Sequence, residues 1–422
     1  MHMLRSFIGD DAFFEGVSQY LKNREFKPAE YHHLRLALED VTGTDLNWFF
    51  KDWFETSGHP TIEVRDSFDA TNMTYHIITS QVQDLDENAV YRLPMKIALI
   101  TGAESQTHNI EIKNLNDTFS FNGFTSRPLG FNIDVDNVIL ADWDIRQDVS
   151  AWKWIARYSN RYLDHIKILN AIDSNNFDLA DVHFIYDELL KKEFWGSRLA
   201  ALEQINLYYL DYADQNFSKM KNLALNDPKS LVRAKAVMLL GQVYSMDNTV
   251  PVIEEAMKDS SFAVLSSALS ALAKLDSAKS LQAAKRLYTE ENDNIYTAIA
   301  DVFMDWGGKE WNDDIRNIML DELSYNEALQ VLNYYGDYLM KFEDDAFLEK
   351  NLDVYENMVD RRSKEWHSYF LRDMITVPYM INNMAINDLE AEEVLSDEES
   401  KALEKKKSIA SKLKKQLDKV MQ

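Results

Sequence analysis

The sequence predicts an α+β protein of several domains, in which short helices come first, β-strands follow and helices fill the rest. Apolar residues recur three and four positions apart over residues 1–59, alternate with polar residues from about 61 to 144, and return to helical spacing beyond Trp143. The chain has 422 residues, of which 46% are hydrophobic, so it can bury several cores. We expect domains at 1–59, 60–146 and 147–422.

Residues 1–59 are predicted to form short amphipathic helices packed on one another. Asp10 or Asp11 can cap the second helix, and Asp45 can cap the last one. Three glycine-containing signals end helices: Gly9, Gly43 as a left-handed carboxy cap, and Gly58-His59-Pro60. The aromatic residues between Phe49 and Phe54 need a large partner surface.

The first residues follow helical spacing with no capping side chain in front of them. Met1, Leu4, Phe7 and Ile8 carry this pattern. We expect the chain to begin inside a helix, with the true amino terminus upstream; the alternative is an ordinary start methionine with a frayed first turn.

Residues 61 to about 144 have a period of two, which indicates strands. Examples are Ile62-Glu-Val64, Tyr75-His-Ile77, Ile110-Glu-Ile112, Phe119-Ser-Phe121 and Phe131-Asn-Ile133-Asp-Val135. The strands are short, turn signals separate them and no helical pattern intervenes, so an antiparallel β-sandwich fits better than a βαβ sheet. Pro94 indicates an edge position or a bulge.

The remainder is predicted to be an α-helical array of HEAT-like hairpins. Ala236, Ala268 and Ala300 lie 32 residues apart, and two sets of large apolar residues share this spacing: Leu240, Leu272 and Met304, and Val232, Val264 and Tyr296. Small and large residues at fixed positions let helix pairs stack closely. The alternative is chance spacing in an alanine-rich helical domain, which would still give stacked hairpins.

Two further patterns concern the limits of this array. Trp195-Gly-Ser-Arg198 echoes Ser230-Leu-Val-Arg233 at a spacing of 35, so the array can start before residue 195. Turn signals divide the helices at 174–176, 226–228, 247–248, 276–277 and 307–308. An acidic block at 388–400 followed by lysines predicts a solvated terminal helix that closes the array.

Composition excludes several function classes. The net charge of -25 repels phosphate backbones and anionic membranes, so nucleic acid is not an expected partner. The absence of cysteine excludes disulfides and thiolate chemistry. Neither a membrane-spanning apolar run nor a signal peptide is visible, and the compartment stays open.

Candidate catalytic residues are not found. No His-Glu-x-x-His occurs, and helical geometry places the side chains of His32 and His33 about 100° apart, which does not suit joint chelation. The other histidines, at 2, 59, 76, 108, 165, 183 and 367, lack carboxylates at ligand spacing and are expected on surfaces or helix faces. Asp305-Trp-Gly-Gly-Lys309 lacks the spacing of a phosphate loop, no Gly-x-Ser-x-Gly occurs, and Arg161 and Arg361-Arg362 are expected on solvated faces. The predicted catalytic, cofactor-binding and metal sites of this chain are therefore none.

A succession of motifs over the first 65 residues resembles the aminopeptidase N family of zinc metallopeptidases (gluzincins), just after their active site. The matching segments, in order, are Met3-Leu4-Arg5 to Phe13, Tyr20-Leu21, Leu34 to Leu38, Gly43-Thr-Asp45-Leu46, Phe49-Phe50-Lys-Asp-Trp53 and Gly58-His-Pro60-Thr-Ile-Glu-Val64. Each segment alone has low specificity, but their common order makes coincidence an unlikely explanation. From residue 66 to 422 the resemblance is architectural only.

The resemblance implies a carboxy-terminal part: the last helices of a thermolysin-like catalytic domain, a β-sandwich, and a HEAT-like domain that encloses the catalytic chamber. It implies zinc in the parent enzyme, bound by His-Glu-x-x-His and a further glutamate, and peptide substrates. None of those ligands aligns to a residue of this chain, so the chain alone is expected to bind no zinc and to be inactive. Bacterial relatives of this kind often carry signal peptides, which would lie upstream.

Two functional hypotheses remain at this stage. The first is a fragment of a zinc-dependent aminopeptidase, a hydrolase that removes amino-terminal residues from peptides. The second is a noncatalytic HEAT-repeat scaffold that presents a surface to a protein partner. The first hypothesis predicts a large exposed apolar face on residues 1–59, through which an isolated fragment could self-associate.

Overall fold

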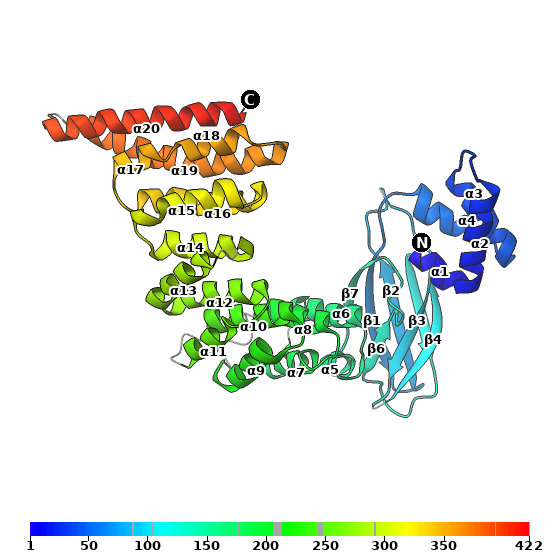
Figure 1. Cartoon of the computed structure of the whole chain (residues 1–422). Helices are drawn as coiled ribbons and strands as arrows, with labels where there is room; N and C mark the ends of the chain where they lie inside the picture. The colour runs from blue at the N-terminus through cyan, green and yellow to red at the C-terminus, as the bar shows by residue number, and fades with distance from the viewer. Residues whose placement is uncertain are drawn as a thin grey trace. The chain divides into compact units, whose positions relative to one another are not determined.

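The computed structural model describes residues 1–86, 88–102, 104–174, 177–205, 213–243, 248–290, 293–392 and 394–421. The chain forms two compact units, Met1–Tyr209 and Leu210–Gln422, called here the N-terminal and C-terminal units (Figure 1). Helices, two sheets and more helices make up the first unit, and the second is helical. The mixed α and β composition is confirmed. The boundaries at 59 and 146 stay predictions; residues 147–209 cluster with the sheets.

Short helices form residues 1–55, as predicted. They are α1 (His2–Ile8), α2 (Asp10–Asn23), α3 (Tyr31–Thr42) and α4 (Asn47–Phe50), which a π-helical turn (Lys51–Glu55) continues. Gly43 ends α3 in the left-handed conformation with φ 63°. The Asp45 carboxylate accepts the Asn47 amide at 3.0 Å, but Leu46 rather than Asp45 occupies the cap position of α4. The predicted cap of α2 is wrong: Gly9 occupies that position, and Asp10 instead forms a bidentate pair with Arg5.

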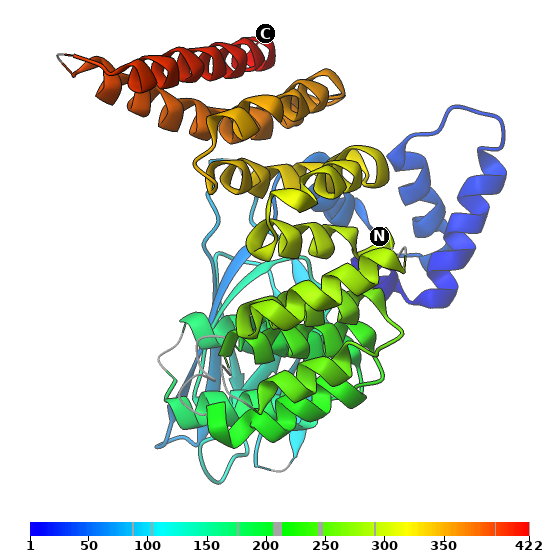
Figure 2. The same ribbon diagram turned by 60° about the vertical axis from the view of Figure 1, so that its left-hand side comes forward.

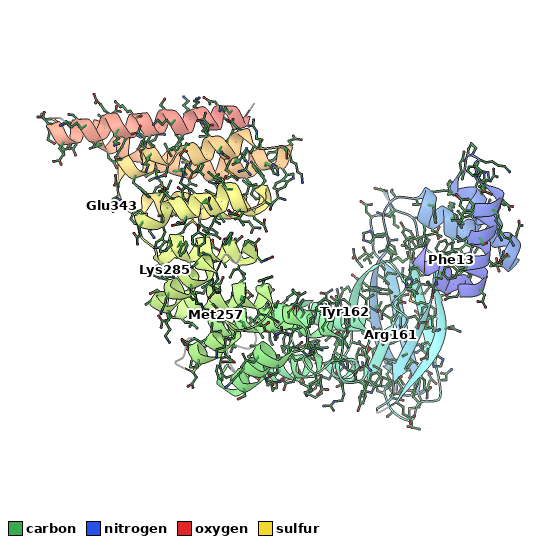
Figure 3. All side chains as sticks on the ribbon, viewed as in Figure 1. Phe13, Arg161, Tyr162, Met257, Lys285 and Glu343 are labelled. Atoms are coloured by element: carbon green, nitrogen blue, oxygen red, sulfur yellow. The ribbon has the colours of Figure 1, made fainter. Side chains whose placement is uncertain are left out.

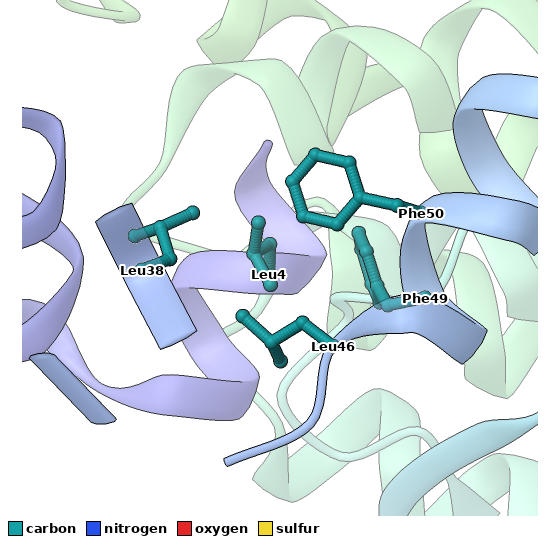
Figure 4. Packing of buried hydrophobic residues seen from close by; sticks show 5 residues of the cluster. All are labelled: Leu4, Leu38, Leu46, Phe49 and Phe50. Carbon is teal, nitrogen blue, oxygen red and sulfur yellow. The ribbon is translucent and has the colours of Figure 1, made fainter. Parts of the chain in front are cut away.

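Five buried side chains join these helices into a small hydrophobic core (Figure 4). They come from α1, α3, α4 and the turn before α4, and they are Leu4, Leu38, Leu46, Phe49 and Phe50. Helical spacing predicts the apolar faces that carry Leu4 and Leu38, whereas which helices meet in this core is known only from the structure. The core positions the end of α4 against the sheets, where the Trp53 ring lies 5.0 Å from the Tyr91 ring.

Seven strands of the described residues form two sheets. They are β1 (Thr61–Asp69), β2 (Thr74–Gln81), β3 (Leu93–Ile100), β4 (Ser105–Ile112), β5 (Asn116–Phe121), β6 (Gly130–Ile133) and β7 (Asp142–Arg146). One sheet has the order β5-β2-β1-β7 and the other the order β4-β3-β6. Burial alternates along β1 and β2, as a period of two requires: Ile62, Val64, Tyr75 and Ile77 are buried while their neighbours are more exposed.

The expectation of purely antiparallel pairing is wrong for one strand. β7 pairs parallel to β1, with Thr61 opposite Asp142 and Arg65 opposite Arg146. The chain leaves β6 in one sheet and crosses to the edge of the other, and such a crossover permits parallel pairing. The Asp142 amide donates to the Pro60 carbonyl at 3.0 Å, so β1 and β7 start at the same end of the sheet.

Pro94 lies in the central strand of its sheet, yet its missing N–H leaves no gap in a ladder. On one side Pro94 is opposite Glu111 of β4, whereas pairing with β6 on the other side begins only at Ile97. The segment around Pro94 is therefore a local edge, which is where a strand proline is tolerated.

In the described residues, four helices follow the sheets in the N-terminal unit: α5 (Val149–Tyr158), α6 (Tyr162–Ser174), α7 (Leu179–Leu189) and α8 (Trp195–Gln204). Aspartates cap two of them, because Asp148 accepts the Ser150 amide and Asp178 accepts the Asp181 amide. α5 packs on β6, and α6 packs on β7. The turn signal at 174–176 lies largely outside the described residues.

The C-terminal unit consists of helices. They are α9 (Ala213–Asn226), α10 (Ser230–Val243), α11 (Thr249–Ala256), α12 (Phe262–Leu275), α13 (Ser277–Thr289), α14 (Tyr296–Trp306), α15 (Asn312–Asn317), α16 (Tyr325–Met340), α17 (Asp345–Lys350), α18 (Asp353–Asp360), α19 (Glu365–Glu390) and α20 (Asp397–Met421). α10 packs against α12 and α12 against α14, so alternate helices stack as Figure 2 shows. Helices end at the predicted signals 226–228, 276–277 and 307–308, while residue 247 lies outside the described residues.

The 32-residue spacing has a structural basis. Ala236, Ala268 and Ala300 are completely buried at equivalent places of α10, α12 and α14. A small side chain there lets the helices approach closely, and Gly241 shows how closely: a Cβ at this residue would lie 2.5 Å from the Cβ of Ala271. The predicted stacking of HEAT-like hairpins is confirmed for this region.

The echo between residues 195 and 230 also has a structural counterpart. Arg198 and Arg233 are each the fourth residue of their helix, α8 and α10. Each guanidinium donates to a carbonyl six residues earlier, Arg198 to Lys192 at 2.6 Å and Arg233 to Asp227 at 2.8 Å. The two helices therefore begin with the same local arrangement.

The terminal helix α20 is less solvated than predicted. Its acidic first turn is as expected, but Ile409, Leu413 and Leu417 are buried. Its lysines pair with carboxylates of α17 and α18 rather than facing solvent alone: Lys412 lies 2.8 Å from Glu349, and Lys419 lies 3.2 Å from Glu356. Among the described residues, no helix is both long and apolar enough to cross a membrane.

Candidate functional site

The described part of the chain contains no set of side chains that could bind a metal ion. Among those residues, no three histidine, aspartate or glutamate side chains lie close enough to hold one ion. The rings of His32 and His33 do come together, with centroids 3.9 Å apart, although helical geometry predicts that they diverge. His33 Nδ1 accepts the Glu30 amide at 3.0 Å, so one of its nitrogens serves as a helix cap.

Three of the other histidines have surroundings that the sequence does not show. His165 and His367 lie on helix faces, as expected, but these faces are buried. His165 Nδ1 lies 2.7 Å from Ser197 Oγ and its Nε2 lies 3.0 Å from the Ser159 carbonyl, and burial lowers its pKa. His59 has a carboxylate neighbour, Asp142, at 2.9 Å. These partners are distant in sequence, so spacing along the chain could not reveal them.

A buried polar network joins the β6–β7 loop to the start of α6. The Asp164 carboxylate is 1% exposed and accepts hydrogen bonds from Asn132 at 3.1 Å, Asn137 at 2.9 Å and Ser159 at 2.7 Å. Arg161, labelled in Figure 3, pairs with Asp136 of the same loop at 3.1 Å. Arg161 therefore lies on a solvent-exposed face, as expected from the sequence, with its guanidinium paired to this loop.

A second pair of charges continues this network. Lys167 Nζ donates to the carbonyls of Ile133 and Asp134 at 2.9 and 3.4 Å, and burial lowers its pKa. Burial likewise raises the pKa of Asp134, while the nearby Lys167 ammonium opposes this rise. Asp134 has φ 50°, and its carboxylate accepts the amides of Val138 and Ile139. The network holds a loop in a strained shape, which is a structural role.

A cavity of about 400 Å³ lies beside this network within the N-terminal unit. Two indole rings, Trp143 and Trp152, line it together with Lys167 and Asn170. Lys167 Nζ lies 5.8 Å from the centre of the Trp143 ring. The cavity lacks a nucleophile paired with a base, so it can hold a ligand by contact but offers no visible acid-base chemistry.

The C-terminal unit contains a smaller cavity of about 270 Å³ with acidic and aromatic walls. Asp301 and Asp305 lie one turn apart on α14, beside the half-exposed rings of Trp306 and Tyr334. Burial, and secondarily the charge of Asp305, raises the pKa of Asp301 to about 6. Burial also raises the pKa of Asp305, and Lys341 opposes this. Such a lining suits a cationic group. From the sequence, residues Asp305 to Lys309 are expected only to form a turn.

An exposed apolar face covers the helices of residues 1–55, as predicted. The largest exposures on α2 and the following turn are those of Phe14 at 54%, Leu21 at 61% and Phe26 at 99%. Leu36 of α3 is exposed at 46%. Phe26 has φ 56°, a rare conformation for a bulky residue. Large exposed apolar side chains gathered on neighbouring elements are typical of interaction surfaces.

Comparisons with known proteins identify relatives. Residues 218–302 match the family model described as HEAT repeats. The chain is 27% identical to aminopeptidase N of Haemophilus influenzae over 163 residues, which is 35% of this chain and 19% of the relative. It is 25% identical to alanine/arginine aminopeptidase of Saccharomyces cerevisiae over 131 residues, which is 29% of this chain and 15% of the relative. The chain is related to aminopeptidases.

Two further matches extend over more of the chain. Probable aminopeptidase 1 of Sulfurisphaera tokodaii is 22% identical over 243 residues, covering 56% of this chain and 29% of the relative. The solved structure of Legionella pneumophila aminopeptidase A in complex with aspartic acid matches with a TM-score of 0.56 at 12% identity, covering 99% of this chain and 55% of that one. The second match concerns the fold alone. The chain spans less than a third of these curated relatives.

Proposed function

We propose that this chain is the carboxy-terminal portion of a zinc-dependent aminopeptidase, a hydrolase that removes amino-terminal residues from peptides. The similarity to several aminopeptidases, of which it spans less than a third, carries the proposal. The exposed apolar face of residues 1–55 supports it, because an upstream catalytic domain would cover this face. In the proposed enzyme this part supplies the scaffold and the walls of the substrate chamber.

The finer domain assignment is part of this proposal. Residues 1–59 would be the end of a thermolysin-like catalytic domain, 60–146 a β-sandwich and 147–422 a HEAT-like domain. Alternating burial along β2 and the first half of β3 supports the sandwich, as does the approach of the His108 ring in β4 to the Phe121 ring in β5, at 4.8 Å. Zinc would bind in the parent enzyme, where it polarises the peptide carbonyl and activates water. The described residues offer no donor set for it, so no catalytic step is assigned to this chain.

The test is hydrolysis by the chain itself. With zinc and a panel of aminoacyl chromogenic substrates, the 422-residue chain is expected to give no turnover above the buffer rate. The same assay on the chain extended by its upstream reading frame is expected to give turnover, which a chelator removes. Turnover by the chain without the extension, or an upstream frame without His-Glu-x-x-His, would contradict the proposal.

A noncatalytic HEAT-repeat scaffold is the second candidate. The match of residues 218–302 to HEAT repeats favours it, since such arrays present surfaces to protein partners. A genuine start codon at Met1, with no upstream frame, would favour this second candidate.

A further inference from the structure

One face of α19 carries a stripe of exposed apolar side chains. Seven residues form this α19 stripe: Trp366 (40% exposed), Tyr369 (56%), Phe370 (54%), Val377 (51%), Met380 (57%), Ile381 (49%) and Met384 (65%). With 3.6 residues per turn they fall within an arc of roughly 120° and extend for about 27 Å. The helix buries its other side through His367, Leu371, Ile375, Pro378, Asn382 and Ile386.

This stripe is unusual for its position in the C-terminal unit. α19 packs against α16 and α20, and an apolar helix face that lies outside such packing is normally small in a soluble protein. At the exposures above, the stripe presents roughly 700 Å² per copy, more than the largest apolar patch of a typical monomer. Two such surfaces together reach about 1,400 Å², within the range of stable protein interfaces.

The order of residues along the stripe is self-complementary. The pairs Trp366 and Met384, Tyr369 and Ile381, and Phe370 and Met380 are each centred on residue 375, with the aromatic member on the amino-terminal side and the aliphatic member on the carboxy-terminal side. In an antiparallel pair of α19 helices with a two-fold axis at residue 375, every aromatic ring therefore meets Met or Ile of the other copy. Sulfur–aromatic contacts favour such pairs.

The charges near the centre of the stripe differ between the two possible orientations of the helix pair. Asp373 is exposed on the stripe and pairs with Arg372 at 3.3 Å. In the antiparallel arrangement Asp373 would lie at the same height along the helix as Val377 of the second copy. The Arg372 guanidinium also lies 5.8 Å from the Tyr369 ring. In the antiparallel pair each Asp373 keeps its own Arg372 as partner and lies about 6 Å along the axis from the second Asp373, whereas a parallel pair would place Asp373 directly against Asp373.

We propose that the α19 stripe is a homodimer interface, at which two copies of this chain pack α19 against α19 in antiparallel register about residue 375. The inference does not depend on the proposed peptidase function. Pro378 lies on the buried side of the helix and does not interrupt the stripe. Because each copy carries a net charge of -25, added salt is expected to strengthen the dimer.

The first test measures molecular mass by sedimentation equilibrium of the full chain from about 1 to 100 μM, a range that brackets micromolar affinity. We expect a dimer whose dissociation constant rises at least about 30-fold in Phe370→Glu and in Met380→Glu, as for the loss of an interface hot spot. Phe14→Glu is the matched control. It adds the same charge to an aromatic position of similar exposure on the face of residues 1–55, and it should leave the dimer unchanged.

The second test reads the register. The chain has no cysteine, so introduced thiols are the only ones present. Mixing Phe370→Cys with Met380→Cys should give disulfide-linked dimers on mild oxidation. Neither variant should cross-link with itself, because identical positions lie about 15 Å apart along the axis and a disulfide needs Cα atoms within about 7 Å.

Each other outcome overturns the proposal. A chain that stays monomeric throughout the concentration range has no such interface. A dimer that survives Phe370→Glu and Met380→Glu, or that only Phe14→Glu dissociates, uses a different surface. Self-cross-linking of Phe370→Cys alone would indicate a parallel pair and overturn the register. Circular dichroism of each variant checks that these exposed positions leave the fold intact.

Discussion

Asp301 is expected to destabilise the C-terminal unit at neutral pH, and its replacement by asparagine is expected to stabilise it. Burial between α12, α14 and α16 raises the pKa of this carboxyl from 3.8 to about 6, and the charge of Asp305 adds to the rise. Lys274 lines the same cavity, but no ion pair or hydrogen bond to the Asp301 carboxylate is found among the described residues. The ionised form is therefore poorly compensated in the folded state.

The size of the effect follows from the difference between the folded and unfolded pKa values. One pKa unit corresponds to about 1.4 kcal/mol, so the rise to about 6 lowers the free energy of unfolding by at most about 3 kcal/mol at pH 7. Below pH 4 both states hold the proton and the penalty vanishes. Between pH 4 and pH 6 the folded state binds more protons than the unfolded state, so stability falls as pH rises and then levels off above pH 6.

The assay is urea unfolding of the wild-type chain and Asp301→Asn at several pH values from 4 to 8. The stability gain of the variant should grow from near zero at pH 4 to its full value above pH 6, equivalent to roughly 6–12 °C in Tm for a unit of this size. Asp337→Asn, an exposed position on α16, is the control and should change stability by less than about 0.5 kcal/mol at any pH. A gain that is independent of pH, or a loss, would refute the reasoning.

Two more predictions follow from packing. Gly241→Ala should lower the free energy of unfolding by about 2 kcal/mol, measured by heat or urea, because the new Cβ meets the backbone of Ala271 at 2.9 Å. Gly336→Ala is the control and should lower it by less, because its Cβ meets only the Tyr355 hydroxyl. Equal losses in the two variants would contradict the close approach of the helices at Gly241. Phe14→Glu should reduce the fluorescence of a bound hydrophobic dye, because it interrupts the apolar face of residues 1–55; unchanged fluorescence would show that this face does not bind the dye.

Much of the fold could be predicted from periodicity, because burial follows local pattern wherever one face of an element is covered. The 32-residue spacing of Ala236, Ala268 and Ala300 identified the stacked helices, and the period of two identified the strands. The parallel pairing of β7 could not be predicted, since it depends on which edge the chain reaches after β6. The burial of His165 was equally invisible, because its partner Ser197 lies on a different helix.

The absence of a predicted site limited what sequence could contribute to function. The acidic and aromatic cavity of the C-terminal unit combines residues from α12, α14 and α16, and no sequence motif contains all of them. Asp305 and Trp306 are the only part of this cavity lining that is visible in the sequence, as an acidic residue and a large ring directly before the Gly307-Gly308 turn. Only the helix stacking brings Asp301 and Tyr334 to the same place.

Arg198 and Arg233, at the fourth positions of α8 and α10, mark where a helix starts by a hydrogen bond to the preceding loop rather than by the spacing of apolar residues. Each one satisfies carbonyls of the loop that precedes its helix, so it fixes the length of that loop as well as the start of the helix. Apolar positions can change size as neighbouring cores are repacked, whereas a donor that must reach a carbonyl six residues earlier tolerates no insertion between them. In divergent relatives, insertions should therefore accumulate before this six-residue segment or after the helix, and the segment itself should keep its length.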